Sequence, residues 1–410
     1  MTRHDPVEAL ASLRHEFGEH GGVNMSIEAS STFTVVDPAT MPDIFAGRKS
    51  PESGGCYLYG RHFNPTVYHL GRQLAALEGT EAAYCSASGM GAISAVIFAL
   101  CNAGDHVVAS HTIYGGTWAL LNDFMPAKTG VRTSFVDTTN LAAVKNAITD
   151  RTRLLYVESM SNPTLRVADI PALAAIAHEA GIPLVVDNTF SPLVLSPARL
   201  GADIVVHSLT KFIGGASDLI GGAVCASGEF IGSLMDLHTG PLMILGPTLD
   251  PSVAASVALR LPHLALRMAA HGERALALAE RTEILGVTVA YPGLPGHPDR
   301  ALLERLRHPD FGYGGLLTID AGTEQKAMAL MNTLQNDHQF GYVAVSLGYF
   351  DTLMSCSASS TSSEMPEEAL LNAEISPGLV RMAIGYSGSL EQRWVQLETA
   401  LRATGLAPMR

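Results

Sequence analysis

The strongest constraint on the fold is an alternation of short β-rich runs and helical patterns between about residues 80 and 230. Its clearest unit has an apolar run over 153–158, a helical pattern that begins after Asp169 and ends at Gly181, and another apolar run over 182–187. This order is typical of parallel strands joined by crossover helices. It predicts an α/β fold with a mostly parallel central sheet, and such sheets bind ligands at the carboxyl ends of their strands.

The sequence on either side of this region follows other patterns. Residues 1–62 lack the alternation and contain several prolines, so we predict an N-terminal arm followed by a large ligand-binding domain over 63–255. After that point, a helical pattern over 257–283 precedes a strand candidate at 316–320. This change predicts a smaller α+β C-terminal domain over 256–410.

Composition excludes some classes of partner. The chain has 26 basic and 39 acidic residues, a formal charge of -13, which argues against a nucleic acid or an anionic membrane as the main partner. Residues 82–104 carry no charge and are long enough for a membrane span. Because this stretch contains Ser86, Gly89 and Asn102, we predict a loop followed by a buried helix instead.

Cysteine and histidine usage points away from disulfides and metals. The five cysteines form no CxxC pair, and their odd number fits a reducing compartment, so we expect a cytoplasmic protein. No secretory signal follows Met1. The 15 histidines show no HExxH motif or regular ligand spacing, so no metal site is predicted.

A lysine, Lys211, stands just past an apolar run, next to hydroxyls and glycines. Ser208 and Thr210 precede it, and Gly214 and Gly215 follow it. A lysine buried at this place has a lowered pKa, which an amine needs to form a Schiff base. The hydroxyls and glycines can hold a phosphate. Taken alone, a lysine after a strand is more often a surface residue, and the hydroxyls and glycines fit ordinary turn chemistry equally well.

Two further features could bind parts of a charged, flat ligand. Gly89 and Met90 open an apolar helical pattern, so their backbone N–H groups can point at an anion. Asp187 ends an apolar run, where a carboxylate is costly unless it is paired. A protonated pyridine nitrogen would pair with Asp187, although a helix cap or a structural salt bridge is the alternative.

Aromatic and guanidinium groups complete the set. Tyr114 could lay its ring on a flat cofactor and use its hydroxyl as an acid or base, or it could simply pack in the core. Tyr59 and Arg61 lie in an extended segment that suits a phosphate. Arg381 stands in the middle of an apolar run, where it binds either a substrate carboxylate or an internal acidic partner.

Taken together, these segments resemble the Cys/Met-metabolism family of pyridoxal-phosphate (PLP) enzymes, which includes γ-lyases and γ-synthases. The resemblance covers nearly the whole chain and keeps the order of the motifs. It implies the PLP-dependent transferase fold type I, similar to aspartate aminotransferase, with PLP as the cofactor. The matching segments are 59–66, 88–93, 114–117, 158–164, 186–189, 208–211, 345–348 and 379–385.

The resemblance also implies roles for individual residues. Lys211 would carry the cofactor and move protons, and Tyr114 would stack on its ring and protonate the leaving group. The cofactor would also be held by Gly89, Met90, Asp187, Ser208 and Thr210. The substrate carboxylate would be bound by Asn162, Ser346 and Arg381. A homotetramer made of two active dimers is implied, in which the arm contributes Tyr59 and Arg61 to the neighbouring active site.

For function, the resemblance implies a lyase that eliminates the γ-substituent of an L-amino acid such as methionine, cystathionine or a homoserine derivative. The alternative is a γ-synthase or sulfhydrylase that joins an O-acylhomoserine to a thiol. Members that act on methionine usually have a cysteine where Gly116 stands here. A usual Met and His are also missing from the serine-rich tract 355–363, predicted to be a loop. These departures favour a polar γ-substituent, including a γ-oxy group as in canavanine.

Overall fold

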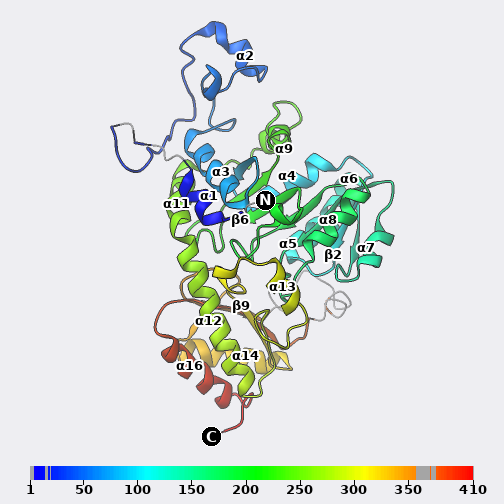
Figure 1. Ribbon diagram of the computed structural model, residues 1–410, viewed down its shortest axis with the longest axis vertical. Coiled ribbons are helices and arrows are strands. Elements are labelled where there is room, and N and C mark those ends of the chain that lie inside the picture. The colour runs from blue at the N-terminus through cyan, green and yellow to red at the C-terminus, as the bar shows by residue number, and fades with distance from the viewer. Residues whose placement is uncertain (1–3, 14–16, 19, 357–369, 371–374, 410) are drawn as a thin grey trace.

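The computed structural model describes residues 4–13, 17–18, 20–356, 370 and 375–409. The chain forms a seven-stranded sheet and a five-stranded sheet, each covered by helices. Figure 1 shows the larger sheet in the upper part of the molecule and the smaller one below it. The predicted α/β fold is confirmed.

The larger sheet has the strand order β1-β7-β6-β5-β4-β2-β3. Strands β2 to β6 are parallel, whereas β7 runs antiparallel to both β6 and β1. The sheet is therefore mostly parallel, as predicted. Its strands are β1 (Ala82–Ser86), β2 (His106–Ser110), β3 (Arg132–Val136), β4 (Thr152–Glu158), β5 (Leu184–Asp187), β6 (Ile204–Ser208) and β7 (Gly222–Ala226).

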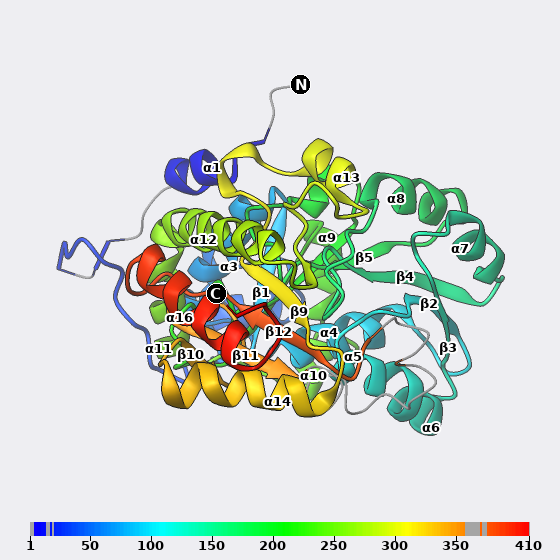
Figure 2. The ribbon, with the colours of Figure 1, turned by 90° about the horizontal axis from the view of Figure 1, so that it is seen from below.

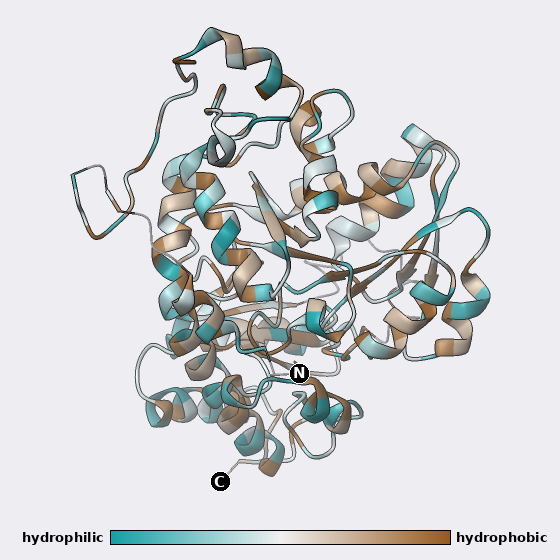
Figure 3. Cartoon of the chain, turned by 45° about the horizontal axis from the view of Figure 1, so that its top comes forward, coloured by the Kyte–Doolittle hydropathy of each residue, from teal (hydrophilic) through white to brown (hydrophobic). Residues whose placement is uncertain are grey.

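Helices cover both faces of this sheet, which explains its continuous apolar strands. Val205 and Val206 are both buried, but they belong to separate core clusters because successive side chains of a strand point to opposite faces. In Figure 3 the strands are mainly brown inside the molecule, and the helices carry teal on outer turns. The covering helices are α3 (Pro65–Glu78), α4 (Gly89–Leu100), α5 (Gly115–Ala119), α6 (Met125–Thr129), α7 (Leu141–Ala147), α8 (Ile170–Glu179), α9 (Gly228–Leu234) and α10 (Pro241–Leu245).

Local sequence signals set some of these boundaries correctly. The side chain of Asp169 caps α8 by accepting a hydrogen bond from the backbone N–H of Ala172. The prediction for residues 82–104 was half wrong, because its first part is strand β1 and not a loop. β1 forms by pairing with β7, a strand that lies far along the sequence and that no local pattern reveals.

The smaller sheet has the order β10-β11-β12-β9-β8. Its strands are β8 (Val289–Ala290), β9 (Leu316–Asp320), β10 (Gly341–Val343), β11 (Thr352–Cys356) and β12 (Leu379–Ala383). The strand predicted at 316–320 is thus β9. Figure 2 shows the helices near this sheet, which are α12 (Leu264–Ile284), α14 (Glu324–Asn332) and α16 (Leu390–Ala403), whereas α13 (Arg300–Leu306) is drawn toward α8.

The helical pattern predicted over 257–283 is two helices joined by a tight turn. α11 (Pro251–Arg260) passes through η5 (Leu261–His263) into α12. The predicted domain boundary at residue 255 therefore falls inside α11. This helical run is long and apolar enough to cross a membrane by length and composition. However, Arg267 in α12 is buried and donates hydrogen bonds to backbone carbonyls of the larger domain, as expected of a core helix.

The N-terminal segment is only partly an extended arm. Its first helix, α1 (Pro6–Ser12), packs against α3. The segment around α2 (Met41–Phe45) projects away from the rest of the chain in Figure 1. Val23 and Val36 in this region are 91% and 92% exposed. The boundary between arm and domain at residue 62 stays a prediction. Of the tract 355–363, Ser355 and Cys356 belong to β11 and the rest lies outside the described residues.

Candidate functional site

A cavity of about 220 Å³ lies at the carboxyl ends of β4, β5 and β6, where the smaller sheet approaches the larger one. This is the edge at which open α/β sheets bind ligands. Most of the predicted site residues line it, namely Gly89, Met90, Tyr114, Asn162, Asp187, Ser208, Thr210, Lys211 and Arg381. The structure therefore brings together residues that are spread over almost 300 positions of the sequence.

Lys211 lies just after β6, and its amine points into the site. Its Nζ donates a hydrogen bond to the Oγ of Ser346, 3.0 Å away. Burial, together with the nearby Arg381 cation, lowers the pKa of Lys211 to about 8. The neutral amine that a nucleophilic or proton-accepting lysine requires is therefore far more abundant near pH 7 than in an ordinary lysine.

The N-terminus of α4 forms the anion-binding end of the cavity. Gly89 and Met90 open this helix, so their N–H groups lack partners within the helix itself. A Cβ at Gly89 would lie 2.8 Å from the Cβ of Ser208, so only glycine lets the helix approach β6 this closely. The Oγ1 of Thr210 accepts a hydrogen bond from the N–H of Gly221 at 3.2 Å. A phosphate fits this end of the cavity, because the N-terminus of α4 favours a negative charge and its backbone N–H groups can donate hydrogen bonds.

Gly214 and Gly215, which we expected beside the phosphate, serve another purpose. A Cβ at Gly214 would lie 2.6 Å from the carbonyl oxygen of Leu209. Gly215 has a positive φ of 73° and lies against the guanidinium of Arg267. Both glycines permit a tight turn after Lys211, and neither is among the residues that line the cavity.

Asp187, at the end of β5, provides a buried negative charge. Its Oδ1 accepts a hydrogen bond from the N–H of Thr189 at 3.0 Å, and its Oδ2 accepts one from the hydroxyl of Tyr156 at 3.2 Å. Burial raises the pKa of Asp187, so the carboxylate gains from a cationic partner. A protonated ring nitrogen is such a partner. The alternative of a structural salt bridge is not seen within the described part of the chain.

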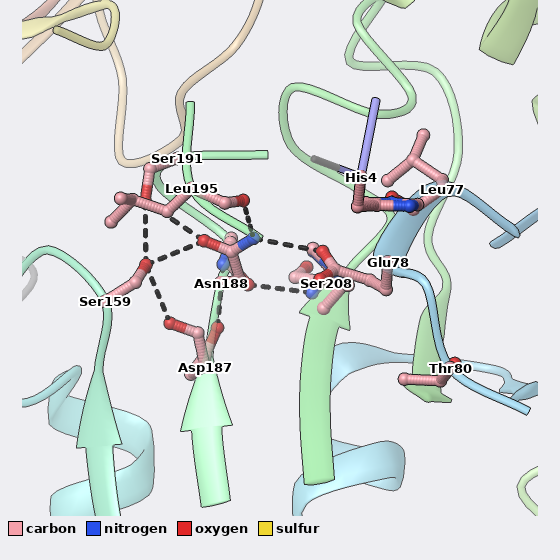
Figure 4. A network of polar contacts seen from close by, with 12 residues as sticks. His4, Leu77, Glu78, Thr80, Ser159, Asp187, Asn188, Ser191, Leu195 and Ser208 are labelled. Atoms are coloured by element: carbon pink, nitrogen blue, oxygen red, sulfur yellow. Dashed lines mark hydrogen bonds and ion pairs between the residues drawn. The ribbon is translucent and has the colours of Figure 1, made fainter. Parts of the chain in front are cut away.

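Behind Asp187, a buried polar network fixes the ends of three strands (Figure 4). Ser159, just past β4, donates a hydrogen bond to the Oδ1 of Asn188 at 2.8 Å. The amide of Asn188 donates to the Oε1 of Glu78 at 3.0 Å, and the same oxygen lies 2.7 Å from the Nε2 of His207 on β6. The network ties helix α3 to the strands that carry Asp187 and Ser208.

Arg381, in the middle of β12, lines the cavity and is only 1% exposed as a residue. Its Nη1 donates to the Oδ1 of Asn162 at 3.1 Å, and its Nη2 donates to the carbonyl oxygen of Ser346 at 3.2 Å. The Nε has no hydrogen-bond partner, and no carboxylate of the described residues forms a salt bridge with Arg381. Burial lowers its pKa to about 10, so it stays charged and can bind an external carboxylate.

Tyr114 also lines the cavity, and the residue is 42% exposed. The ring lies over Gly116, where an added Cβ would come within 2.6 Å of the Cε1 of Tyr114. The absence of a side chain at residue 116 therefore allows the present position of the ring. A flat ligand in the cavity would meet an aromatic face here.

Tyr59 and Arg61 are the predicted site residues that lie away from the cavity. The Nη1 of Arg61 donates to the carbonyl oxygen of Met243 at 2.8 Å, and Tyr59 is 43% exposed. Within one chain, neither residue lines the cavity. Their role in the active site of a neighbouring subunit stays a prediction.

Sequence reasoning assigned no role to Glu158, Tyr156 or Thr189. Glu158 ends a buried apolar strand, so the argument applied to Asp187 would also have identified it. Thr189 contacts two predicted site residues. Its N–H donates a hydrogen bond to Asp187, and its Oγ1 accepts one from the N–H of Ser208 at 2.8 Å. Nothing in the local sequence indicates that contact. Among the described residues, no group of three or more His, Cys, Asp or Glu side chains could hold a metal ion.

Comparison with known proteins agrees with this geometry. The family described as Cys/Met metabolism PLP-dependent enzyme matches residues 8–392. The chain is 58% identical to methionine gamma-lyase of Arabidopsis thaliana, over 97% of this chain and 90% of that protein. It is also similar to the structure of cystathionine gamma synthase from Xanthomonas oryzae, with 32% identity, a TM-score of 0.87 and coverage of 98% and 99% of the two chains.

A second similar structure contains the cofactor itself. It is a Campylobacter jejuni O-acetylhomoserine (thiol)-lyase with a pyridoxyl-lysine phosphate, 25% identical with a TM-score of 0.88, covering 97% of this chain and all of that chain. PLP fits the donors found here, since Lys211 offers an amine, Asp187 a buried carboxylate and α4 an anion-binding helix end. The chain therefore belongs to the Cys/Met metabolism family of PLP-dependent enzymes, and pyridoxal phosphate is its cofactor.

Proposed function

We propose that this enzyme is a γ-lyase that removes the γ-substituent of an L-amino acid, with L-methionine as the first candidate substrate. The observation that carries the proposal is one cavity containing the Lys211 amine, the Tyr114 hydroxyl and an unpaired edge of Arg381. Identity of 58% to a methionine gamma-lyase supports methionine despite Gly116. The overall reaction would consume L-methionine and water and produce methanethiol, ammonia and 2-oxobutanoate.

The chain's own residues divide the work of this reaction. Arg381, steadied by Asn162, binds the substrate carboxylate and thereby places Cα and Cβ near the amine of Lys211. Lys211 accepts a proton from Cα, releases that proton again, and only then, as the neutral amine, accepts one from Cβ. Tyr114 gives a proton to the departing γ-group. When bound, PLP supplies an electron sink for the carbon that loses its proton.

A γ-synthase remains the second candidate. The similarity to a cystathionine gamma synthase structure over 98% of this chain supports it. A synthase shares the proton transfers described above and differs when a thiol adds to the activated substrate. Cystathionine, O-acylhomoserines and γ-oxy amino acids such as canavanine are therefore included as substrates in the test.

The test is to purify the protein with PLP and measure 2-oxo acid and thiol release from each amino acid without an added thiol. Release from methionine supports the γ-lyase, and relative kcat/KM values rank the γ-substituents. A product that forms only when cysteine or sulfide is present would replace the lyase with the synthase. Failure of PLP to produce an absorbance change that depends on Lys211 would contradict both functions.

We also propose that the active unit contains two copies of the chain and that two such dimers form a homotetramer. Ile220 and Val345 line the cavity, yet they are 64% and 65% exposed, and Ile244 and Leu245 at the end of α10 are also exposed. Apolar side chains at the mouth of a site suit a covering protein surface. Arg61 of the second copy would then reach the anion-binding end of the cavity.

A complementation experiment tests this arrangement. Lys211→Ala and Arg61→Ala should each be inactive alone, and mixing them after dissociation should restore about a quarter of the wild-type sites if each site takes residues from two chains. No recovery in mixed dimers would contradict a shared site. Sedimentation should show a tetramer.

We further propose a cytoplasmic location. The five cysteines are free thiols, and all except Cys56 are buried. Free thiols of this kind suit a reducing compartment. Cell fractionation with an antibody against the chain is the direct test, and recovery in an oxidising compartment would contradict it.

A further inference from the structure

Glu158 holds two separate backbone segments of the site with its two carboxylate oxygens. Its Oε1 accepts a hydrogen bond from the N–H of Tyr114 at 2.7 Å, and its Oε2 accepts one from the N–H of Asn162 at 2.9 Å. The residue is the last of β4 and is buried. The position of Tyr114 relative to Asn162 therefore depends on one carboxylate.

The two segments perform different tasks in the proposed reaction. Asn162 contacts the guanidinium of Arg381, which also contacts the backbone of Ser346. Tyr114 carries the hydroxyl that protonates the leaving group. Glu158 thus connects the side of the cavity that binds the carboxylate with the side that releases the γ-substituent.

The electrostatic surroundings show that a carboxylate is costly at this place. Glu158 and Asp187 lie opposite each other in the paired strands β4 and β5. Burial raises the pKa of Glu158, and the charge of Asp187 raises it further, whereas the two backbone N–H groups and Arg381 lower it. A neutral polar side chain would avoid this repulsion. However, an amide side chain could not accept the hydrogen bonds from both backbone N–H groups in the same way. Only one of its two terminal atoms is an acceptor oxygen, and the other is an NH₂ donor.

We propose that Glu158 is a positioning residue that fixes the distance between Tyr114 and the Arg381–Asn162 pair, and so matches the site to the length of the substrate. This inference rests on the proposed γ-elimination. Glu158 acts through the backbone of its two partners and needs no proton transfer of its own. Its substitution should therefore affect substrate binding and turnover while the fold and the covalent attachment of PLP to Lys211 persist.

Two variants separate positioning from charge. Glu158→Gln keeps the size of the side chain but can accept only one of the two N–H bonds. Glu158→Asp keeps the charge but is one carbon shorter, so it cannot hold both segments where they are. Glu158 also borders a second cavity of about 140 Å³ lined largely by hydroxyl groups, which gives the amide of Gln polar neighbours. The matched control is Glu179→Gln, an exposed residue at the end of α8 that pairs with Lys145.

The experiment measures three quantities on the PLP-loaded protein. The first is kcat and KM for elimination, and the second is the visible circular dichroism of the bound cofactor. The third is the Kd of norleucine, which has no γ-substituent that can leave and is followed by cofactor absorbance. Because norleucine binding needs no turnover, it tests Glu158 even if the wild type eliminates from no amino acid tested, which would contradict the proposed function alone.

For Glu158→Gln and Glu158→Asp we expect norleucine binding to weaken and kcat/KM to fall by about 10- to 100-fold, because small displacements at a reacting site cost about that much. The circular dichroism band should change, and Glu179→Gln should match the wild type in all three. Wild-type norleucine Kd and kcat/KM in either folded, PLP-loaded Glu158 variant would overturn the proposal. Loss of fold and cofactor in both variants would also overturn it, since Glu158 would then have only a structural role.

Discussion

The amine of Lys211 and the hydroxyl of Ser346 lie 3.0 Å apart, although 135 residues separate them in the sequence. Lys211 follows β6 of the larger sheet, and Ser346 precedes β11 of the smaller one. The carbonyl oxygen of Ser346 also accepts a hydrogen bond from Arg381. One residue of the smaller domain thus contacts both the reactive amine and the carboxylate-binding guanidinium, so the site is complete only when the two sheets are packed together.

The lowered pKa of Lys211 predicts how the cofactor-free protein takes up PLP. Attack on the aldehyde needs the neutral amine, so the rate should rise with pH and level off above about 8, instead of near the ordinary value of 10.5. At pH 7 a group with this pKa is neutral in roughly a tenth of the molecules. Stopped-flow absorbance at a series of pH values measures the midpoint. A midpoint near 10 would show that burial does not lower this pKa.

Replacing Lys211 with alanine should abolish covalent attachment of PLP and remove the group that moves protons. We expect kcat for elimination to fall by at least about 10²- to 10⁴-fold, the usual contribution of a general acid or base. Reduction with borohydride followed by mass spectrometry should label the wild type at Lys211 and leave the variant unlabelled. Label on a different lysine of the wild type would contradict the assignment.

Arg381→Lys should weaken substrate binding more than turnover. Lysine keeps the positive charge but cannot bind a carboxylate and the oxygen atoms of Asn162 and Ser346 together, as the planar guanidinium does. Loss of a charged hydrogen bond costs about 1.5–3 kcal/mol, so KM should rise by roughly 10- to 100-fold. Steady-state kinetics give both constants, and amines that lack the carboxylate should bind the variant and the wild type alike. An unchanged KM would show that the carboxylate binds elsewhere.

Gly116→Ala should displace the ring of Tyr114, since the new Cβ would lie within 2.6 Å of its Cε1. The displaced ring should change the visible circular dichroism of bound PLP and lower kcat by about tenfold or more. The control is Gly232→Ala, because a Cβ at Gly232 would lie in open space. Gly286→Ala would not serve as a control, since Gly286 has a positive φ. If Gly116→Ala and Gly232→Ala have equal kcat values, the ring tolerates a neighbour.

His207→Ala should destabilise the protein, because it leaves the buried carboxylate of Glu78 with the amide of Asn188 as its remaining neighbour in the network. Breaking a buried pair of this kind costs about 3–5 kcal/mol. The exposed pair of His178 and Asp203 offers a contrast, and His178→Ala should cost no more than about 1 kcal/mol. Urea denaturation followed by far-ultraviolet circular dichroism compares the two variants. Equal losses would mean that burial does not strengthen the His207 pair.

Much of the fold could be predicted because it depends on neighbours in the sequence. The cap at Asp169, the apolar runs of β4 to β6 and the boundaries of β9 all follow from residues within a few positions. The strand β1 could not, because its partner β7 is remote in the sequence and strand pairing has no local signature. The break between α11 and α12 was also missed, although Pro262 lies in the connecting turn.

The site residues can also be separated into those that the local sequence indicates and those that only the fold reveals. By itself the sequence determined which chemical groups stand within or beside apolar runs, namely Lys211, Asp187, Gly89 and Arg381, because a charged residue or glycine in such a place is visible without a structure. Only the tertiary structure decided which of these groups meet, and it added Glu158 as the residue that joins Tyr114 to Asn162. The physical reason is that hydrogen bonds act over about 3 Å between atoms whose distance is set by the packing of whole sheets and helices.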